Sequence, residues 1–177
     1  LRRLFGEGAF SQAFVPILAA SREKEGDEAT HRLVDAVATV LAWALLLTCV
    51  IGVVGAPILV WLLASGLERF DSAVMMTRVM FPYIGFMSMV ALAAGILNTW
   101  KRFAVPAATP VLLNLAVIAA AWFGVPWFKS IGVQPIYALA VGVMAGGVLQ
   151  LAVQVPALAR VGLLPRIGLA PSALRAA

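Results

Sequence analysis

Long apolar runs without a charged residue dominate this chain. Residues 36–67, 79–100, 103–128 and 130–159 contain no Asp, Glu, Lys or Arg. Each run is longer than the roughly 20 residues that an α-helix needs to cross the hydrocarbon core of a bilayer. Inside lipid the backbone has no water to bond, so apolar runs of this length form helices. The pattern therefore predicts an all-α polytopic membrane protein.

Proline, glycine and charged residues divide the chain into five expected helical segments. The second is expected to break or kink near Gly55-Ala56-Pro57, because proline removes a backbone donor and crowds the preceding turn. The expected order is a helix remnant at 4–20 (within 1–20), a cytoplasmic loop at 21–32, a helix at 33–56 with an interfacial piece at 58–65 (together 33–65), helices at 74–99, 107–123 and 136–159, and a basic cytoplasmic tail at 160–177.

Lys and Arg residues collect in alternate loops. Those after the first, third and fifth segments carry most of them: Arg22, Lys24, Arg32, Lys101, Arg102, Arg160, Arg166 and Arg175. The intervening connections carry fewer: Arg69, Arg78 and Lys129. Positively charged loops stay on the cytoplasmic side of a membrane. We therefore expect the first segment to exit into the cytoplasm and the chain to be a multi-pass protein.

Composition narrows the function classes. The chain is 63% hydrophobic and 12% charged, so its net charge of +5 belongs to helix ends rather than to a nucleic-acid-binding surface. A single cysteine, Cys49, and a single histidine, His31, give neither a disulfide framework nor a metal-ligand pattern. We expect His31 to be a solvated loop residue. No nucleophile–base pair is evident, so the case for an enzyme is poor and we expect no cofactor.

The most informative polar group lies near the beginning of the sequence. Arg2 and Arg3 precede Glu7 and Ser11, and a helix would bring Arg3 and Glu7 onto one face, four residues apart. If the helix ends near residue 20, the arginines lie ~25–27 Å from its cytoplasmic end. Two interpretations stay open. The arginines line a water-filled cavity and meet an anion, or they flank a short span and reach the lipid headgroups.

Other polar residues within the spans are neutral. For Asn114, Gln150 and Gln154 we expect hydrogen bonds between helices, with direct substrate contact as the alternative. Gln150 and Gln154 are four residues apart, on one helical face. Gly142 and Gly146 have the same spacing, which allows two helices to approach closely.

Three stretches resemble a known family. Residues 1–18, LRRLFGEGAFSQAFVPIL, look like the second transmembrane helix of the MurJ/MviN family of bacterial lipid II flippases. Residues 95–107, GILNTWKRFAVPA, with the following Pro110 and Asn114, resemble that family's connection between its fourth and fifth helices. Residues 146–151, GGVLQL, and 164–166, LPR, resemble its sixth helix and the segment after it.

This resemblance implies a fold and a function. The chain would be helices two to six, in the N-terminal lobe of a fourteen-helix transporter of the multidrug/oligosaccharidyl-lipid/polysaccharide exporter superfamily. In that family two lobes enclose a cationic cavity that moves the undecaprenyl diphosphate-linked peptidoglycan precursor, lipid II, from the cytoplasmic to the periplasmic leaflet of the inner membrane. Arg2 matches its cavity arginine, Arg3 lies beside it, and Glu7 matches an acidic residue that looks like a partner for cavity arginines. With Asn114, these are the candidate substrate-binding residues.

The resemblance also implies partners. Lipid II, membrane lipids and the remaining helices of a full-length protein are expected to contact the chain, which we interpret as a fragment; nucleic acid is not expected. Two alternatives remain. The first is a related exporter of another lipid-linked oligosaccharide or a drug. The second is a non-transporting membrane scaffold, in which Arg2 and Glu7 would face headgroups or protein instead of a cavity.

Overall fold

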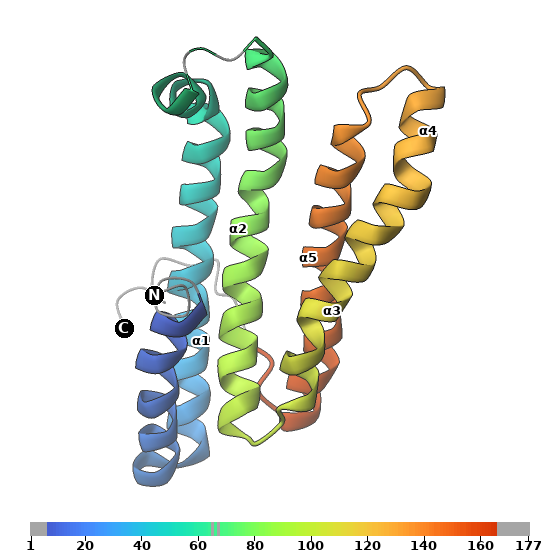
Figure 1. Cartoon of the computed structure of the whole chain (residues 1–177). Helices are drawn as coiled ribbons and strands as arrows, with labels where there is room; N and C mark the ends of the chain where they lie inside the picture. Colours follow the sequence, from blue (N-terminus) through green and yellow to red (C-terminus); the bar gives the residue numbers. More distant parts are fainter. Residues whose placement is uncertain (1–6, 65, 67, 166–177) are drawn as a thin grey trace. The chain divides into compact units, whose positions relative to one another are not determined.

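The computed structural model describes residues 7–64, 66 and 68–165, and in this part of the chain every regular element is helical (Figure 1). The elements are α1 (Glu7–Ala64), α2 (Phe70–Thr99), α3 (Ala104–Ala119), the π-helix η1 (Ala120–Gly124), α4 (Val125–Ser130) and α5 (Ile136–Val161).

Four of the helical stretches are long and apolar enough to cross a membrane: Gly26–Ala64, Phe70–Thr99, Ala104–Ser130 and Ile136–Val161. At most a third of the most apolar window of each is buried within the chain. Large apolar side chains such as Leu63 and Trp122 are 82% and 76% exposed, which suits contact with lipid or with further helices. The prediction of an all-α polytopic membrane protein is confirmed.

The expected loop at residues 21–32 is helical instead. Helix α1 runs through this region and departs from helical geometry at Gly26, with φ 82° and ψ −177°. Arg, Glu and Lys, which fill positions 22–25, are good helix formers, so their charge does not end the helix. Thr30 Oγ1 donates to the Gly26 carbonyl oxygen over 2.8 Å at the start of the second segment. The reversal that we expected from a loop is therefore made at one glycine.

Prolines end the helices less often than we expected. Helix α1 continues through Pro57 to Ala64 without a break, and its last turns bend away from the turns before them, which agrees with the kink expected as the alternative (Figure 1). The segment expected at 107–123 instead begins at Ala104 and continues through η1 and α4 to Ser130. Neighbouring helices and local π adjustments accommodate proline in apolar helices, and η1 comes directly before Val125-Pro126.

Two compact units can be distinguished, and each is described separately. Unit 1 comprises residues 1–44, 87–109 and 151–177, and unit 2 comprises residues 45–86 and 110–150. The core of unit 1 joins the two segments of α1 to α2 and to the end of α5. Its buried residues are Phe14, Leu18, Val34, Ala38, Leu92, Ala93, Ile96, Leu97, Leu158 and Leu163.

Unit 2 is held together by close helix approaches. A Cβ atom added at Gly142 would lie 2.5 Å from the Ala120 Cβ, and one at Gly146 would lie 2.6 Å from the Leu113 Cδ1. The two glycines of the expected small-residue motif therefore face the α3–η1 helix. A smaller cluster of Ala56, Val60 and Val74 joins α1 to α2.

Three helix ends use the same backbone motif. After α5, the Leu163 amide donates to the Leu158 carbonyl over 3.1 Å and the Gly162 amide to the Ala159 carbonyl over 3.0 Å. This is the Schellman arrangement, which places its central residue in the left-handed region. Gly132 and Gly162 fill that place with φ 72° and 78°, whereas α2 uses Lys101 with φ 56°.

Candidate functional site

The four predicted substrate-binding residues are only partly described. Arg2 and Arg3 lie outside the described residues. Glu7 begins α1, but its side chain also lies outside what the structure describes. Asn114 lies on α3, in unit 2, with an exposed side chain. Their joint role in substrate binding stays a prediction.

The helical residues that follow the sequence EGAFSQ (7–12) are packed in the core of unit 1. Phe14 and Leu18, which follow the motif, are 5% and 0% exposed and belong to the core shared with α2. A Cβ added at Gly95 would lie 3.5 Å from the Phe14 Cδ1 and 3.7 Å from the Val15 Cγ2, so a glycine on α2 makes room for this helix. Packing thus fixes the helix immediately after the motif.

Two buried glutamines mark polar positions on α5. Gln150 and Gln154 are 2% and 0% exposed. Neither the Oε1 nor the Nε2 of Gln154 has a hydrogen-bond partner among the described residues, so the interhelical bond that we expected for it is absent there. A buried amide left without a partner costs about 1–3 kcal/mol. No contact among the described residues of unit 1 therefore explains why a polar side chain is buried at position 154.

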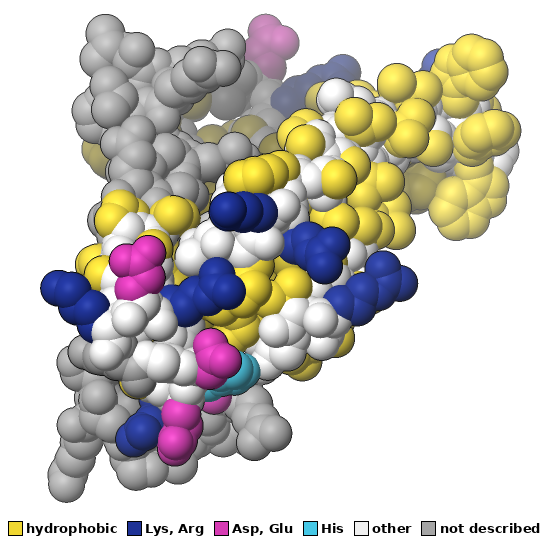
Figure 2. Space-filling view, turned by 90° about the horizontal axis from the view of Figure 1, so that it is seen from below, with side chains coloured by type: hydrophobic (Ala, Val, Ile, Leu, Met, Phe, Trp, Pro, Cys, Tyr) yellow, Lys and Arg dark blue, Asp and Glu magenta, His cyan; other side chains and the backbone are white. Residues whose placement is uncertain are grey.

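Cations gather at one end of unit 1 (Figure 2). The view from below shows Lys and Arg side chains on this face, with acidic side chains between them. The Arg22 Cζ lies 4.6 Å from the centroid of a Trp100 ring, a cation–π distance. Lys101 and Arg102 follow Trp100 directly and are exposed. Among the described residues, no group of three or more His, Cys, Asp or Glu side chains could hold a metal ion.

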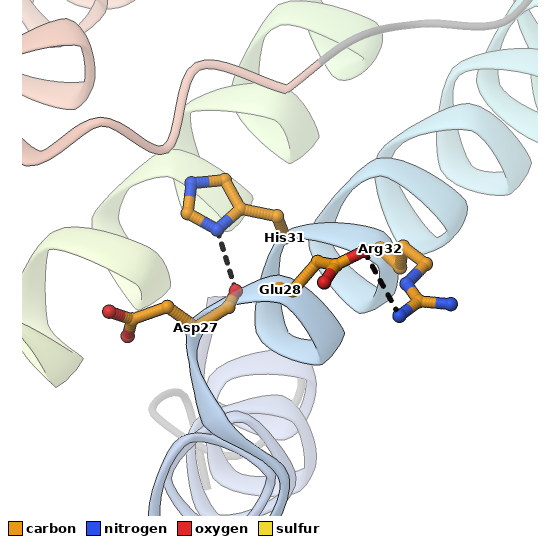
Figure 3. Close-up of polar contacts among 4 residues, drawn as sticks. All are labelled: Asp27, Glu28, His31 and Arg32. Atoms are coloured by element: carbon orange, nitrogen blue, oxygen red, sulfur yellow. Dashed lines mark hydrogen bonds and ion pairs between the residues drawn. The ribbon is translucent and has the colours of Figure 1, made fainter.

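His31 is exposed, as expected, but it is not simply solvated. Its Nδ1 lies 2.7 Å from the Asp27 carbonyl oxygen, one helical turn earlier, and its Nε2 lies 2.8 Å from the Gly162 carbonyl oxygen. Figure 3 shows the contact with Asp27 and, beside it, the ion pair of Arg32 with Glu28 at 3.4 Å. The backbone contacts raise the pKa of His31 above its ordinary 6.5.

Sequence reasoning missed both long-range contacts at this end of unit 1. The Arg22–Trp100 pair and the His31–Gly162 contact join residues that are far apart in the chain, and no local pattern pairs them. One usable signal was available. Arg22, His31, Trp100 and Gly162 all lie beside the ends of apolar runs, which an alternating topology brings to the same side of a membrane.

The helices and the cationic end define the class of protein: a multi-pass membrane protein built from apolar helices. A family model described as lipid II flippase MurJ matches residues 1–176. The lipid II flippase MurJ of Burkholderia cenocepacia is 55% identical over 97% of this chain and 33% of that protein. Proteins of Haemophilus influenzae and Vibrio cholerae, both named probable lipid II flippase MurJ, are 36% and 37% identical over 93% and 94% of this chain.

The chain belongs to the lipid II flippase MurJ family. It spans about a third of the length of these curated relatives, since the aligned part covers 33%, 34% and 33% of the three proteins. The resemblance inferred from the sequence motifs is confirmed.

Proposed function

We propose that the chain forms part of a flippase that moves lipid II from the cytoplasmic to the periplasmic leaflet of the bacterial inner membrane by alternating access. The observation that carries this proposal is the family match over residues 1–176 together with 55% identity to a protein named lipid II flippase MurJ. A flippase of this kind is a transporter and needs no catalytic residue.

In this proposal Arg2 and Arg3 bind the diphosphate of the lipid headgroup. An arginine at the centre of a span costs about 2.5–3.5 kcal/mol on insertion scales, and such residues usually face a cavity or a partner. The planar guanidinium donates paired hydrogen bonds that match phosphate oxygens. Glu7, one turn after Arg3, orients the arginines. Asn114, an exposed amide within an apolar helix, adds a neutral polar contact.

The distribution of charge supports a cytoplasmic location for the cationic end of unit 1. Its described residues include six cations: Arg22, Lys24, Arg32, Lys101, Arg102 and Arg160. The described residues of unit 2 include three cations: Arg69, Arg78 and Lys129. Because Lys and Arg are retained on the cytoplasmic side, the end with six cations faces the cytoplasm. Lipid II would then enter from that side.

The test is complementation by the full-length protein in cells depleted of their own flippase. We expect Arg2→Ala to abolish export of the peptidoglycan precursor while the protein reaches the membrane at the wild-type level. Arg2→Lys should retain more activity than Arg2→Ala, because lysine keeps the positive charge but lacks the paired N–H donors of the guanidinium. Lys24→Ala, which removes a cation from the cytoplasmic end, is the matched control and should complement. Full complementation by Arg2→Ala would contradict the proposal, and so would failure of both Arg2→Ala and Lys24→Ala.

A binding measurement separates lipid II from the substrates of related exporters. Purified full-length protein should retain lipid II more strongly than undecaprenyl diphosphate carrying an unrelated sugar, and Arg2→Ala should weaken both. Equal retention of the two lipids would favour an exporter with a different substrate.

A further inference from the structure

The only histidine of the chain, His31, sits between two backbone carbonyl groups that belong to different helices. The Asp27 carbonyl lies in the first turn after the Gly26 break, in the same helical segment as His31. The Gly162 carbonyl belongs to the turn that ends α5. Both contacts lie within unit 1 and are 2.7 and 2.8 Å long, which are good hydrogen-bond distances.

The chemistry of the ring decides what this geometry requires. A carbonyl oxygen only accepts hydrogen bonds, so each ring nitrogen must donate one. Neutral imidazole carries a single N–H and can satisfy one of the two carbonyls. Imidazolium carries two and satisfies both. Two simultaneous contacts of this length therefore belong to the protonated ring.

We propose that His31 is a pH-sensitive clasp: as an imidazolium it hydrogen-bonds to the start of the second α1 segment and to the end of α5 at once, and when it loses a proton the single remaining N–H is shared between the two carbonyls, which weakens its hold on α5. This is independent of the substrate proposed above. His31 lies in the charged stretch 26–35, before the charge-free run that begins at residue 36, so it can exchange protons with water.

The turn after α5 exposes a carbonyl group to His31 and buries the next side chain in the core. Gly162 adopts φ 78°, which turns the chain out of the helix and leaves the Gly162 carbonyl free of the α5 ladder. Leu163, the next residue, is 2% exposed and packs in the core with Leu158. A buried side chain and one carbonyl contact thus secure the turn from two sides. Loss of the His31 contact leaves only the apolar side.

The charged groups that act on His31 are the Asp27 and Asp35 carboxylates of α1. Glu28 and Arg32 lie beside His31 on the same helix, Arg160 lies two residues before Gly162 on α5, and Lys101 and Arg102 follow α2. Glu28 and Arg32 pair with each other. The Asp27 carbonyl is the main cause that raises the pKa of His31 and the Gly162 carbonyl is the second; slight burial opposes them, and the Asp27 and Asp35 carboxylates add smaller contributions in the same direction.

The first experiment is a histidine titration by NMR on the full-length protein in detergent micelles. Signals of His31 are those that vanish in His31→Gln. We expect a pKa above 6.5 and, at low pH, two ring N–H protons that exchange slowly with water. Asp27→Asn and Asp35→Asn remove a carboxylate but keep both carbonyls, so the pKa should stay above 6.5 in each. A wild-type pKa at or below 6.5, or a fall to 6.5 in Asp27→Asn, would overturn the proposal.

The second experiment reads the clasp itself through hydrogen exchange of the Gly162 and Leu163 amides. Comparing His31→Phe, whose ring carries no donor for the Gly162 carbonyl, with wild type at the same pH cancels the intrinsic pH dependence of exchange. Below pH 6.5 the variant should exchange about five-fold faster, the effect of one hydrogen bond. The ratio should fall toward one as the pH rises through the pKa of His31. A ratio that is the same at all pH values would overturn the proposal.

Discussion

Arg22, near the end of the first segment of α1, stacks on Trp100, the residue that follows α2, with the Arg22 Cζ 4.6 Å from the ring centroid. The arginine is exposed and the tryptophan is half-buried. The pair joins two elements of unit 1 that are separated by most of α1 and α2 in sequence.

Removal of this pair should have a small and measurable effect. We expect Arg22→Ala to lower the free energy of unfolding of the full-length protein by about 0.5–1 kcal/mol, the value of a cation–π contact at an exposed site. A double-mutant cycle with Trp100→Leu, followed by chemical unfolding in detergent, isolates the coupling. Lys24→Ala, an exposed cation two residues further on, is the control and should show no coupling to position 100.

Lys101 should be replaceable by glycine with a gain in stability. Its φ of 56° lies in the left-handed region, where Gly132 and Gly162 occupy the same place in their own motifs. An L-residue there costs about 1 kcal/mol relative to glycine. Lys101→Gly should therefore raise the free energy of unfolding by about 1 kcal/mol. Arg102→Gly, at a residue without positive φ, should lower it; an equal response of the two variants would contradict this interpretation.

Two glycines in the apolar helices should respond in opposite directions to alanine. At Gly142 the new Cβ would lie 2.5 Å from the Ala120 Cβ and 3.3 Å from the Ala116 carbonyl oxygen, neither of which can rotate away. We expect Gly142→Ala to destabilise by about 1–3 kcal/mol. Gly55 has nothing within 4 Å, so Gly55→Ala should stabilise by about 0.5–1 kcal/mol through helix propensity. Thermal unfolding of both variants in detergent tests the pair.

Gln154 should tolerate an apolar replacement. Its amide is fully buried without a partner among the described residues, so Gln154→Leu removes a polar group and no hydrogen bond made there. We expect an unchanged or higher melting temperature. Leu158→Ala, one turn further along α5 in the core, should cost about 2–5 kcal/mol. A large loss in Gln154→Leu would reveal a partner for the amide elsewhere in the full-length protein.

Stability should depend on pH through His31. The folded state raises the pKa of this ring, so its contribution to stability is complete below the unfolded value of about 6.5 and is lost as pH rises through the higher folded value. The difference in free energy of unfolding between wild type and His31→Gln should shrink over that interval. An increase of this free-energy difference with rising pH would contradict the prediction.

Much of the fold could be predicted because the backbone of an apolar run in lipid must satisfy its own hydrogen bonds, which favours a helix. Each of the four charge-free runs contains most of a membrane-length helical stretch in the described part of the chain, and helix α5 begins at Ile136, as its Pro135 indicated. The close approach at Gly142 and Gly146 could also be inferred from spacing alone, although its partner, the α3–η1 helix, could not.

The errors arose where one local signal was given too much weight. Charges at 22–25 suggested a loop, but those residues favour helix, and Gly26 alone departs from it. Pro57 indicated a break or a kink, and α1 stays helical through it to Ala64. The contacts of His31 and Arg22 depend on which helix ends meet, which is tertiary information that no short window of sequence contains.

The Gly26 break carries a consequence for biogenesis. Its φ of 82° and ψ of −177° fall in a region that is essentially restricted to glycine. Without the break, the 58 residues of α1 would extend as one rod about 87 Å long, nearly three times the ~30 Å of hydrocarbon. A side chain at position 26 would therefore favour a continuous helix over the hairpin during membrane insertion. The spans that follow would then insert with the opposite orientation.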